Sequence, residues 1–402
     1  MINLINKNKK WGCDYVFSDE LINELREKIV TRTQHIAKYE PSLGEDLQVL
    51  AIRYFLLKRL PNHTPYSISI IETELSKRIK EKLGKQFQGH NFNQRTKLND
   101  KDSVKDRGEK NYFIILSTLY KHNSINFIYE YLKTIINEEF DKFKNNDIEK
   151  FIELYYSYDK KTPRKFTYNI EIIDNKAVAK GYLNDELFIQ KYAKNPSIAK
   201  KKLFNEILKL NNLELDTSEI RKVRKKYAKN PVAVEICENT LKNIGFIDKN
   251  DKLDPINDWR KIEYLYRALD LSTRLNDHYR FQVLEFYGDS ILNILAGRFL
   301  IEKNISKEET ARYYTELTWN KTLYPNTINT GLYKTLQNCE SIKVTGKLLA
   351  DAFEALVAAL YLSYPEDVLY NYLKPIFEEN FQKVQENNTL KNKENTNHDS
   401  AS

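Results

Sequence analysis

Four carboxylates in the C-terminal half of the chain have the spacing of a metal centre. Glu285 and Asp289 are four residues apart in VLEFYGDSIL, and Asp351 and Glu354 are three apart in GKLLADAFEALVAALYL. Both runs have the periodicity of helices, and residues three or four apart share one helix face. Small residues flank the acids, so the two helices can cross closely. Carboxylates gathered beside an apolar core repel one another, and such a cluster needs raised pKa values or bound cations.

Clustered carboxylate oxygens are the ligands that Mg²⁺ prefers, and a site for two such ions supports in-line attack of water on a phosphodiester. The alternative for either run alone is an amphipathic core helix with ordinary solvated acids, because acids at these spacings are common on helices.

Taken together, the two runs resemble the ribonuclease III family. The signature helix of that family reads roughly LEFLGDSVL, and its second acidic helix reads roughly ADAFEALIGALYLD. Between them, ISKEETARYYTELTWNKTL at 305–323 aligns without a gap with the family's LSEGELTRLRSALVNNKTL. Three ordered blocks at matching spacing are a specific signal, and the sequence is identified as a member of this family.

The resemblance implies a site and an activity. It places the family's metal-binding acids on Glu285, Asp289, Asp351 and Glu354, with Asp289 and Glu354 closest to the chemistry. The implied cofactor is Mg²⁺, for which Mn²⁺ substitutes. The implied reaction is endonucleolytic hydrolysis of double-stranded RNA, as in RNA processing, leaving 5′-phosphate and 3′-hydroxyl ends. Lys321, in the intervening block, is an expected RNA contact.

The chain departs from the family at two outer acids, which are Gln282 and Lys307 here, although Glu308 and Glu309 follow the second. These outer positions tune the metal site, so we expect activity to survive. The first alternative is a catalytically silent scaffold of the same fold that binds RNA or the ribosome. The second is an unrelated helical metallohydrolase acting on nucleotides, which would need a phosphate loop or histidine ligands.

Composition fits a helical protein of two or three domains. The chain has 402 residues, with 11 glycines and 10 prolines, so breaks between helices are few. Three widely spaced cysteines exclude a disulfide framework. The first residues lack a long apolar segment, and no run of 18 apolar residues occurs. We therefore expect a soluble, intracellular protein with no membrane contact.

The positive charge is concentrated in one segment. Residues 190–229 hold twelve Lys or Arg against four acids, a surplus of +8 (12 − 4) that equals the net charge of the whole chain. A solvated basic face is the usual reason for such a run. Beside an RNA-cutting domain, contact with phosphates is the better interpretation.

This basic segment begins inside a predicted α+β domain at 146–215. A helical run at 147–157 precedes three alternating segments, at 165–173, 176–183 and 186–193, and Pro196 then starts a helix. The order helix, three strands, helix resembles a double-stranded-RNA-binding domain. The predicted RNA-binding residues are Lys200, Lys201 and Lys202. A small connector domain is the alternative.

The remaining segments complete the predicted fold class: mainly α, with all-helical ribonuclease III domains on either side of the α+β domain. Residues 216–385 form the catalytic domain, and the polar stretch 386–402 is expected to be disordered. Residues 1–145 contain runs that resemble the helix after the signature and the second acidic helix.

In that N-terminal copy, alignment places Lys110 and Phe113 at the positions of Asp351 and Glu354. It is therefore interpreted as a degenerate ribonuclease III-like domain that cannot bind metals, with an unrelated helical domain as the alternative.

The pairing of domains has two solutions. Two chains can pair through their C-terminal domains, because an isologous contact matches a patch to itself. This homodimer is the favoured prediction. Its expected contact surface is apolar and consists of Phe281, Val283, Leu284, Phe286 and Tyr287. Alternatively, the N-terminal domain packs on the C-terminal domain of its own chain and forms a pseudo-dimer with one working site.

Overall fold

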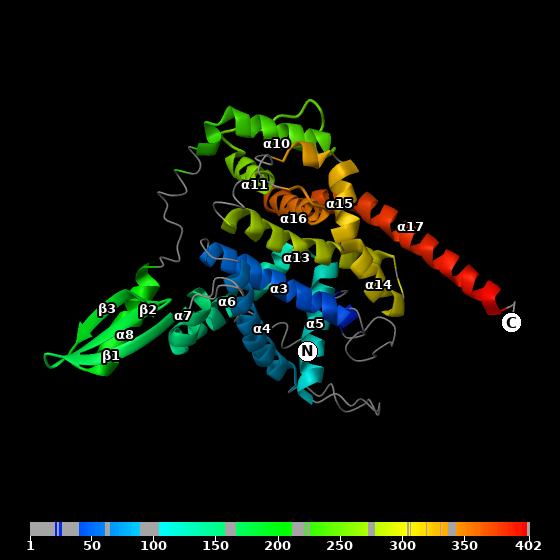
Figure 1. Ribbon diagram of the computed structural model, residues 1–402. Coiled ribbons are helices and arrows are strands. Elements are labelled where there is room, and N and C mark those ends of the chain that lie inside the picture. The colour runs from blue at the N-terminus through cyan, green and yellow to red at the C-terminus, as the bar shows by residue number, and fades with distance from the viewer. Residues whose placement is uncertain are drawn as a thin grey trace. The chain divides into compact units, whose positions relative to one another are not determined.

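Figure 1 shows the computed structural model of the chain. The structure describes residues 21, 24–25, 40–60, 65–88, 104–156, 166–210, 222, 226–271, 278–303, 305, 307–318, 320–329, 331–336 and 343–399.

The N-terminal part of the described chain is helical. Its elements are α3 (Glu40–Arg59), α4 (Pro65–Gln88), α5 (Val104–Lys121) and α6 (Ile125–Asn146). Residues 111–120 of α5 are buried on every side of the helix. A helix that is apolar all round belongs to the inside of a domain rather than to its surface.

A small α+β region follows: α7 (Ile148–Tyr156), β1 (Phe166–Ile173), β2 (Lys176–Leu183), β3 (Glu186–Ala193) and α8 (Pro196–Leu210). The strands pair antiparallel in the order β1-β2-β3. Both connections are two-residue turns with positive φ, for example 49° at Asp174 and 59° at Asn175, which suits tight hairpins. At the start of α8 the Asn195 side chain accepts the N–H of Ile198 at 2.9 Å.

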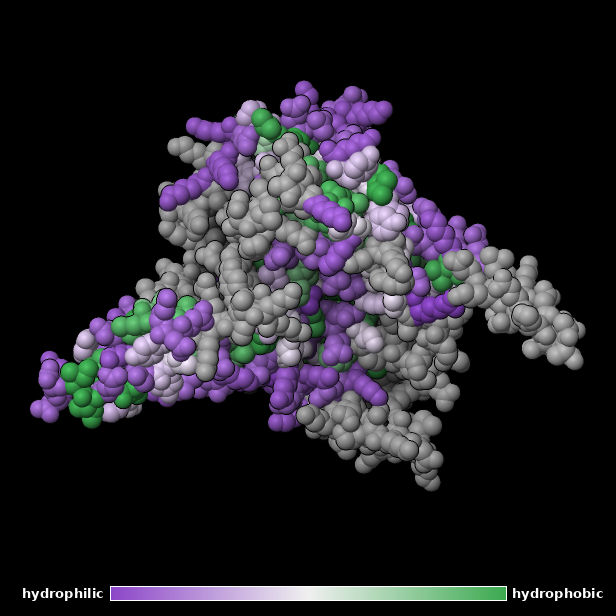
Figure 2. Space-filling model, viewed as in Figure 1, coloured by the Kyte–Doolittle hydropathy of each residue, from purple (hydrophilic) through white to green (hydrophobic). Residues whose placement is uncertain are grey.

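Helix α8 packs against all three strands. Apolar side chains near the two turns stay exposed, including Ile172 at 73% and Leu187 at 54%. Figure 2 shows the corresponding hydrophobic patches over the sheet. A small antiparallel sheet commonly buries one face and leaves the other to solvent. The predicted order of helix, three strands and helix is present.

The C-terminal part is helical again. Its elements are α10 (Pro231–Asn243), α11 (Trp259–Leu269), α13 (His278–Glu302), α14 (Lys307–Thr318), α15 (Asn320–Asn329), η3 (Leu332–Lys334), α16 (Gly346–Ser363) and α17 (Glu366–Asp399). Helix α16 is the centre of this part: it packs against α11, α13 and α15, and every residue from Leu348 to Tyr361 is buried. The predicted fold class, mainly α with a small antiparallel sheet between helices, is confirmed.

The described residues divide into two compact units. One holds the described parts of 51–112 and 126–220; the other holds those of 18–50, 113–125 and 221–402. This division differs from the predicted boundaries, because two N-terminal segments group with the C-terminal half. No helix in the described part of the chain is long and apolar enough to cross a membrane.

The C-terminal end also differs from expectation. The sequence predicts disorder over 386–402, whereas α17 continues to Asp399. Residues 386–399 contain neither glycine nor proline, so nothing in their sequence stops the helix that starts at Glu366.

Candidate metal centre

Two helices cross at an unusually short separation to build the site. Thr345 caps α16, its hydroxyl accepting the N–H of Leu348 at 3.2 Å. In α13, a Cβ atom added to Gly288 would lie 2.5 Å from the carbonyl carbon of Glu354. Real Cβ atoms do not approach backbone atoms so closely, so only glycine permits this crossing. The sequence GDS in one helix and ADAFEA in the other therefore bring the acidic faces together.

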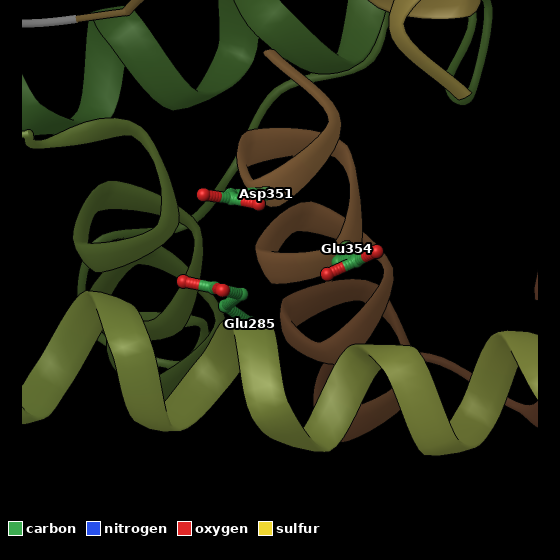
Figure 3. A group of neighbouring side chains, drawn as sticks. All are labelled: Glu285, Asp351 and Glu354. Atoms are coloured by element: carbon green, nitrogen blue, oxygen red, sulfur yellow. The ribbon is translucent and has the colours of Figure 1, made fainter. Parts of the chain in front are cut away.

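Three of the four predicted acids meet at this crossing (Figure 3). One carboxylate oxygen from each of Glu285, Asp351 and Glu354 lies within 4.8 Å of the others. Asp351 is 1% exposed and Glu354 is 7% exposed, while Glu285 is half-buried. Carboxylates this close and this buried cannot all be ionised unless a cation joins them.

The electrostatics of Glu354 show this conflict. Its pKa is raised to about 9, chiefly by burial and then by the charges of Asp289, Glu285 and Asp351. The nearby Lys347 lowers it, but by less. At neutral pH this carboxyl is therefore protonated unless a cation compensates it, as expected for a carboxylate that serves as a metal ligand.

Asp289, the fourth predicted acid, is not a member of the group of three. It lies one turn after Glu285 on α13, is half-buried, and accepts a hydrogen bond from the side-chain amide of Asn293 at 3.4 Å. Its charge is nevertheless the largest of the charges that raise the pKa of Glu354. The structure thus places Asp289 beside the cluster, and its role as a metal ligand stays a prediction.

The sequence analysis missed a cation at this site. Lys347, in the first turn of α16, donates from Nζ to a carboxylate oxygen of Asp351 at 2.9 Å. Although partial burial opposes it, the bond to Asp351 and the charges of Glu285 and Glu354 raise the pKa of Lys347. Its side chain is 66% exposed, so the ammonium reaches in from solvent and neutralises part of the cluster. The signal was present as the i, i+4 pair of Lys347 and Asp351.

The predicted RNA-binding lysines of α8 are not equivalent. Lys200 forms an ion pair with Glu149 of α7 and lies 5.0 Å from the ring centroid of Tyr168. The bond to Glu149 raises the pKa of Lys200. Lys201 and Lys202 are exposed, and Lys202 donates to the carbonyl of Tyr192 at 3.4 Å. Two of the three ammonium groups therefore face solvent without a carboxylate partner that the structure shows.

Gln282 is half-buried in α13. The side chains of Lys307 and Lys321 lie outside the described part of the chain, although their backbones belong to α14 and α15.

Comparison with known proteins finds similarity in the same part of the chain. Residues 282–365 match the ribonuclease III domain. Ribonuclease 3 of Mycoplasma mobile is 31% identical over 154 residues, which cover 36% of this chain and 57% of that protein. Ribonuclease 3 of Roseiflexus sp. is 34% identical over 128 residues, covering 28% of this chain and 54% of that protein. Ribonuclease 3 of Geobacillus thermodenitrificans is 28% identical over 144 residues, with 33% and 54% covered.

The chain spans a little more than half the length of these relatives. The matched residues contain the whole acidic crossing of α13 and α16. The protein therefore contains a ribonuclease III domain, at residues 282–365 in its C-terminal half. This confirms the resemblance drawn from the sequence.

Proposed function

We propose that this protein is a Mg²⁺-dependent endoribonuclease that hydrolyses phosphodiester bonds of double-stranded RNA and leaves 5′-phosphate and 3′-hydroxyl ends. The observation that carries the proposal is the buried carboxylate cluster of Glu285, Asp351 and Glu354, within a ribonuclease III domain. A scaffold of the same fold would have no use for buried acids that burial and mutual repulsion destabilise.

The ligand set fits a hard divalent cation. All the gathered donors are carboxylate oxygens, which suit Mg²⁺ and accept Mn²⁺. When bound, such ions lower the pKa of an attacking water and stabilise the departing 3′ oxygen. In the proposed site Glu285, Asp351 and Glu354 hold the cations, and Asp289 adds negative charge from the adjacent turn of α13.

Substrate recognition would come from a different part of the chain. The exposed ammonium groups of Lys201 and Lys202 stand one turn into α8, after the Asn195 cap. Lysines near a helix N-terminus add to the positive end of the helix dipole, which attracts phosphates. We assign Lys200 a smaller share, because Glu149 already neutralises it.

The predicted homodimer is not part of the proposal. In a single chain Phe281 is 0%, Leu284 is 6% and Tyr287 is 1% exposed. Val283 and Phe286 are half-buried. The apolar surface that a second chain would need is thus largely covered already.

The test is cleavage of labelled duplex RNA, with single-stranded RNA and free nucleotide as comparison substrates, with Mg²⁺ or with a chelator. Cleavage of the duplex alone, and only with the metal, is the expected result. Glu354→Gln and Asp289→Asn should each abolish cleavage while duplex binding persists, since they remove metal charge and not phosphate contacts.

Glu378→Gln is the matched control. Glu378 lies on α17 and forms an ion pair with Lys303 at 2.6 Å. Among the described residues it is not a member of the carboxylate group of the metal centre. Wild-type activity in Glu354→Gln at low Mg²⁺ would overturn the site assignment. Ligation of the products to an acceptor with a 3′-hydroxyl tests for the 5′-phosphate.

A further inference from the structure

A second helix crossing repeats the geometry of the metal centre. A Cβ atom added to Gly44, in α3, would lie 2.6 Å from the carbonyl carbon of Phe113 in α5. The same atom on Gly288 in α13 would lie 2.5 Å from the carbonyl carbon of Glu354 in α16. Both contacts join a helical glycine to the backbone of a second, buried helix. Helix α3 therefore corresponds to the signature helix itself, and not to the helix after it as the sequence suggested.

The two crossings share their register beyond the glycine. Counting seven residues onward from Phe113 and from Glu354 reaches Tyr120 and Tyr361, and five further reaches Ile125 and Glu366. Ile125 is the first residue of α6, and Glu366 is the first residue of α17. The helix that follows thus starts at the same position in both copies, without an insertion or a deletion.

The N-terminal copy lacks the ligands. The register places Pro41, Lys110 and Phe113 where Glu285, Asp351 and Glu354 stand, and Glu45 is the one acid retained, at the position of Asp289. The side chains of Lys110 and Glu45 are exposed, whereas Phe113 is 4% exposed. An apolar ring and an ammonium at ligand positions exclude a divalent cation there.

Corresponding residues of the two copies touch each other. The Glu366 carboxylate accepts the N–H of Ile125 at 2.7 Å and the hydroxyl of Tyr120 at 2.9 Å. Ile125 and Glu366 are equivalent positions, and equivalent positions meet where a two-fold axis passes between two copies. The N-terminal segment 113–125 and the C-terminal segment 221–402 belong to one compact unit, so this contact lies inside that unit.

The carboxylate at this contact is buried and has several partners. Glu366 is buried, with 6% of its side chain exposed, and Arg298 of α13 lies 3.5 Å from it. A buried carboxylate is tolerated only with partners, and Glu366 has a backbone N–H, a hydroxyl and a guanidinium. A second hydrogen bond, from the Tyr314 hydroxyl to Asp46 at 3.1 Å, joins α14 to the first half of α3.

We propose that the N-terminal copy takes the place of a second chain, so that one polypeptide forms a pseudo-dimer with a single hydrolytic centre and cuts one strand of an RNA duplex per binding event. The inference rests on the proposed function for its chemistry. Its pairing part rests on the repeated glycine crossing, the contact of equivalent residues at Glu366, and the burial of Phe281, Leu284 and Tyr287 in one chain.

The test has two independent arms on the full chain. Sedimentation at micromolar concentration should give the mass of one chain, 47.6 kDa, for the free protein. The complex with duplex RNA should give the same protein mass once the mass of the RNA is subtracted. Twice that mass would overturn the intramolecular pair. The second arm uses a duplex labelled on both strands and long enough for a nicked strand to stay annealed. After limited cleavage, denaturing gels should show cut strands while native gels show a full-length duplex.

Short duplex products on the native gel, appearing as early as the cut strands, would mean two centres and would overturn the single-strand cut. Absence of any cleavage would instead refute the proposed function, and the mass alone would then decide the pairing. The variant Phe113→Leu distinguishes the roles of the two copies. It keeps the packing of the N-terminal copy apolar, so nicking should be unchanged. Glu354→Gln at the equivalent position should abolish nicking at an unchanged mass.

Discussion

Replacing Gly288 by alanine is the sharpest test of the helix crossing. The new Cβ would clash with the carbonyl oxygen of Glu354 and lie 2.5 Å from its carbonyl carbon, whereas ordinary contact begins at 3.4 Å, so α13 and α16 must separate by at least 0.9 Å (3.4 − 2.5). The obstacle is backbone, so no rotamer change relieves it. A radial gap of 0.5–1 Å forfeits about a quarter to a half of the dispersion attraction across an interface. Overpacking of this kind costs roughly 3 kcal/mol.

Alanine also stabilises the helix by about 0.5–1 kcal/mol relative to glycine. The net loss is therefore about 2 kcal/mol, which for a unit of this size corresponds to a fall of roughly 4–8 °C in melting temperature. The effect on catalysis should be larger, because Glu285 moves away from Asp351 and Glu354 by a similar distance. Displacing a catalytic group by ~1 Å commonly costs about a hundredfold in rate.

Thermal denaturation and cleavage of duplex RNA in Mg²⁺ measure the two effects. Gly346→Ala is the matched control: it lies at the start of α16, and its added Cβ would be 3.6 Å from the Tyr324 ring, an ordinary contact. The control should keep wild-type activity. If Gly288→Ala melts and cleaves like the control, the close crossing does not position the carboxylates and the reasoning fails.

Three further predictions concern charge. The folded-state pKa of Glu354 is about 9 and its ordinary value is 4.5, so the metal-free protein should lose stability as pH rises between these values. In melting curves taken with a chelator, Glu354→Gln should reduce this loss. Lys347→Ala removes the ammonium that competes for the cluster, so half-saturation by Mg²⁺, followed by thermal shift, should fall; an unchanged midpoint would mean that this ammonium does not compete. Replacing Lys201 and Lys202 together by alanine should reduce the log–log salt slope of duplex binding by about two, whereas Lys200→Ala should change it less, and equal effects would contradict the pairing with Glu149.

The parts of the site that sequence could predict are those set by local periodicity. Spacings of three and four placed the acids on one face of each helix, and two-residue turns with Asp174 and Asn175 marked the first hairpin. Lys347 was missed because its pairing with Asp351 looks like any surface i, i+4 pair until α13 brings Glu285 alongside. The separation of Asp289 from the group of three likewise depends on how α13 is rotated against α16, which periodicity does not determine.

The N-terminal copy was harder to place for a related physical reason. The family is identified in a sequence by its carboxylates, and the N-terminal copy lacks most of them. Its glycine can be matched with that of the C-terminal copy only when the backbone that faces it is known. Gly44 and Gly288 occupy equivalent positions because the helix crossing requires a missing Cβ whether or not a metal binds.

At the position opposite, the two copies differ in residue type but not in burial: Phe113 is 4% exposed and Glu354 is 7% exposed, so both are interior side chains. Burial of Phe stabilises a fold, whereas burial of a carboxyl whose pKa rises to about 9 destabilises it at neutral pH. Packing is thus common to both crossings, and the metal centre is an added cost that only the C-terminal copy bears. The N-terminal copy, which has no buried carboxyl at this position, can therefore be the more stable half of the pair. The contact of Ile125 with Glu366 supports this arrangement.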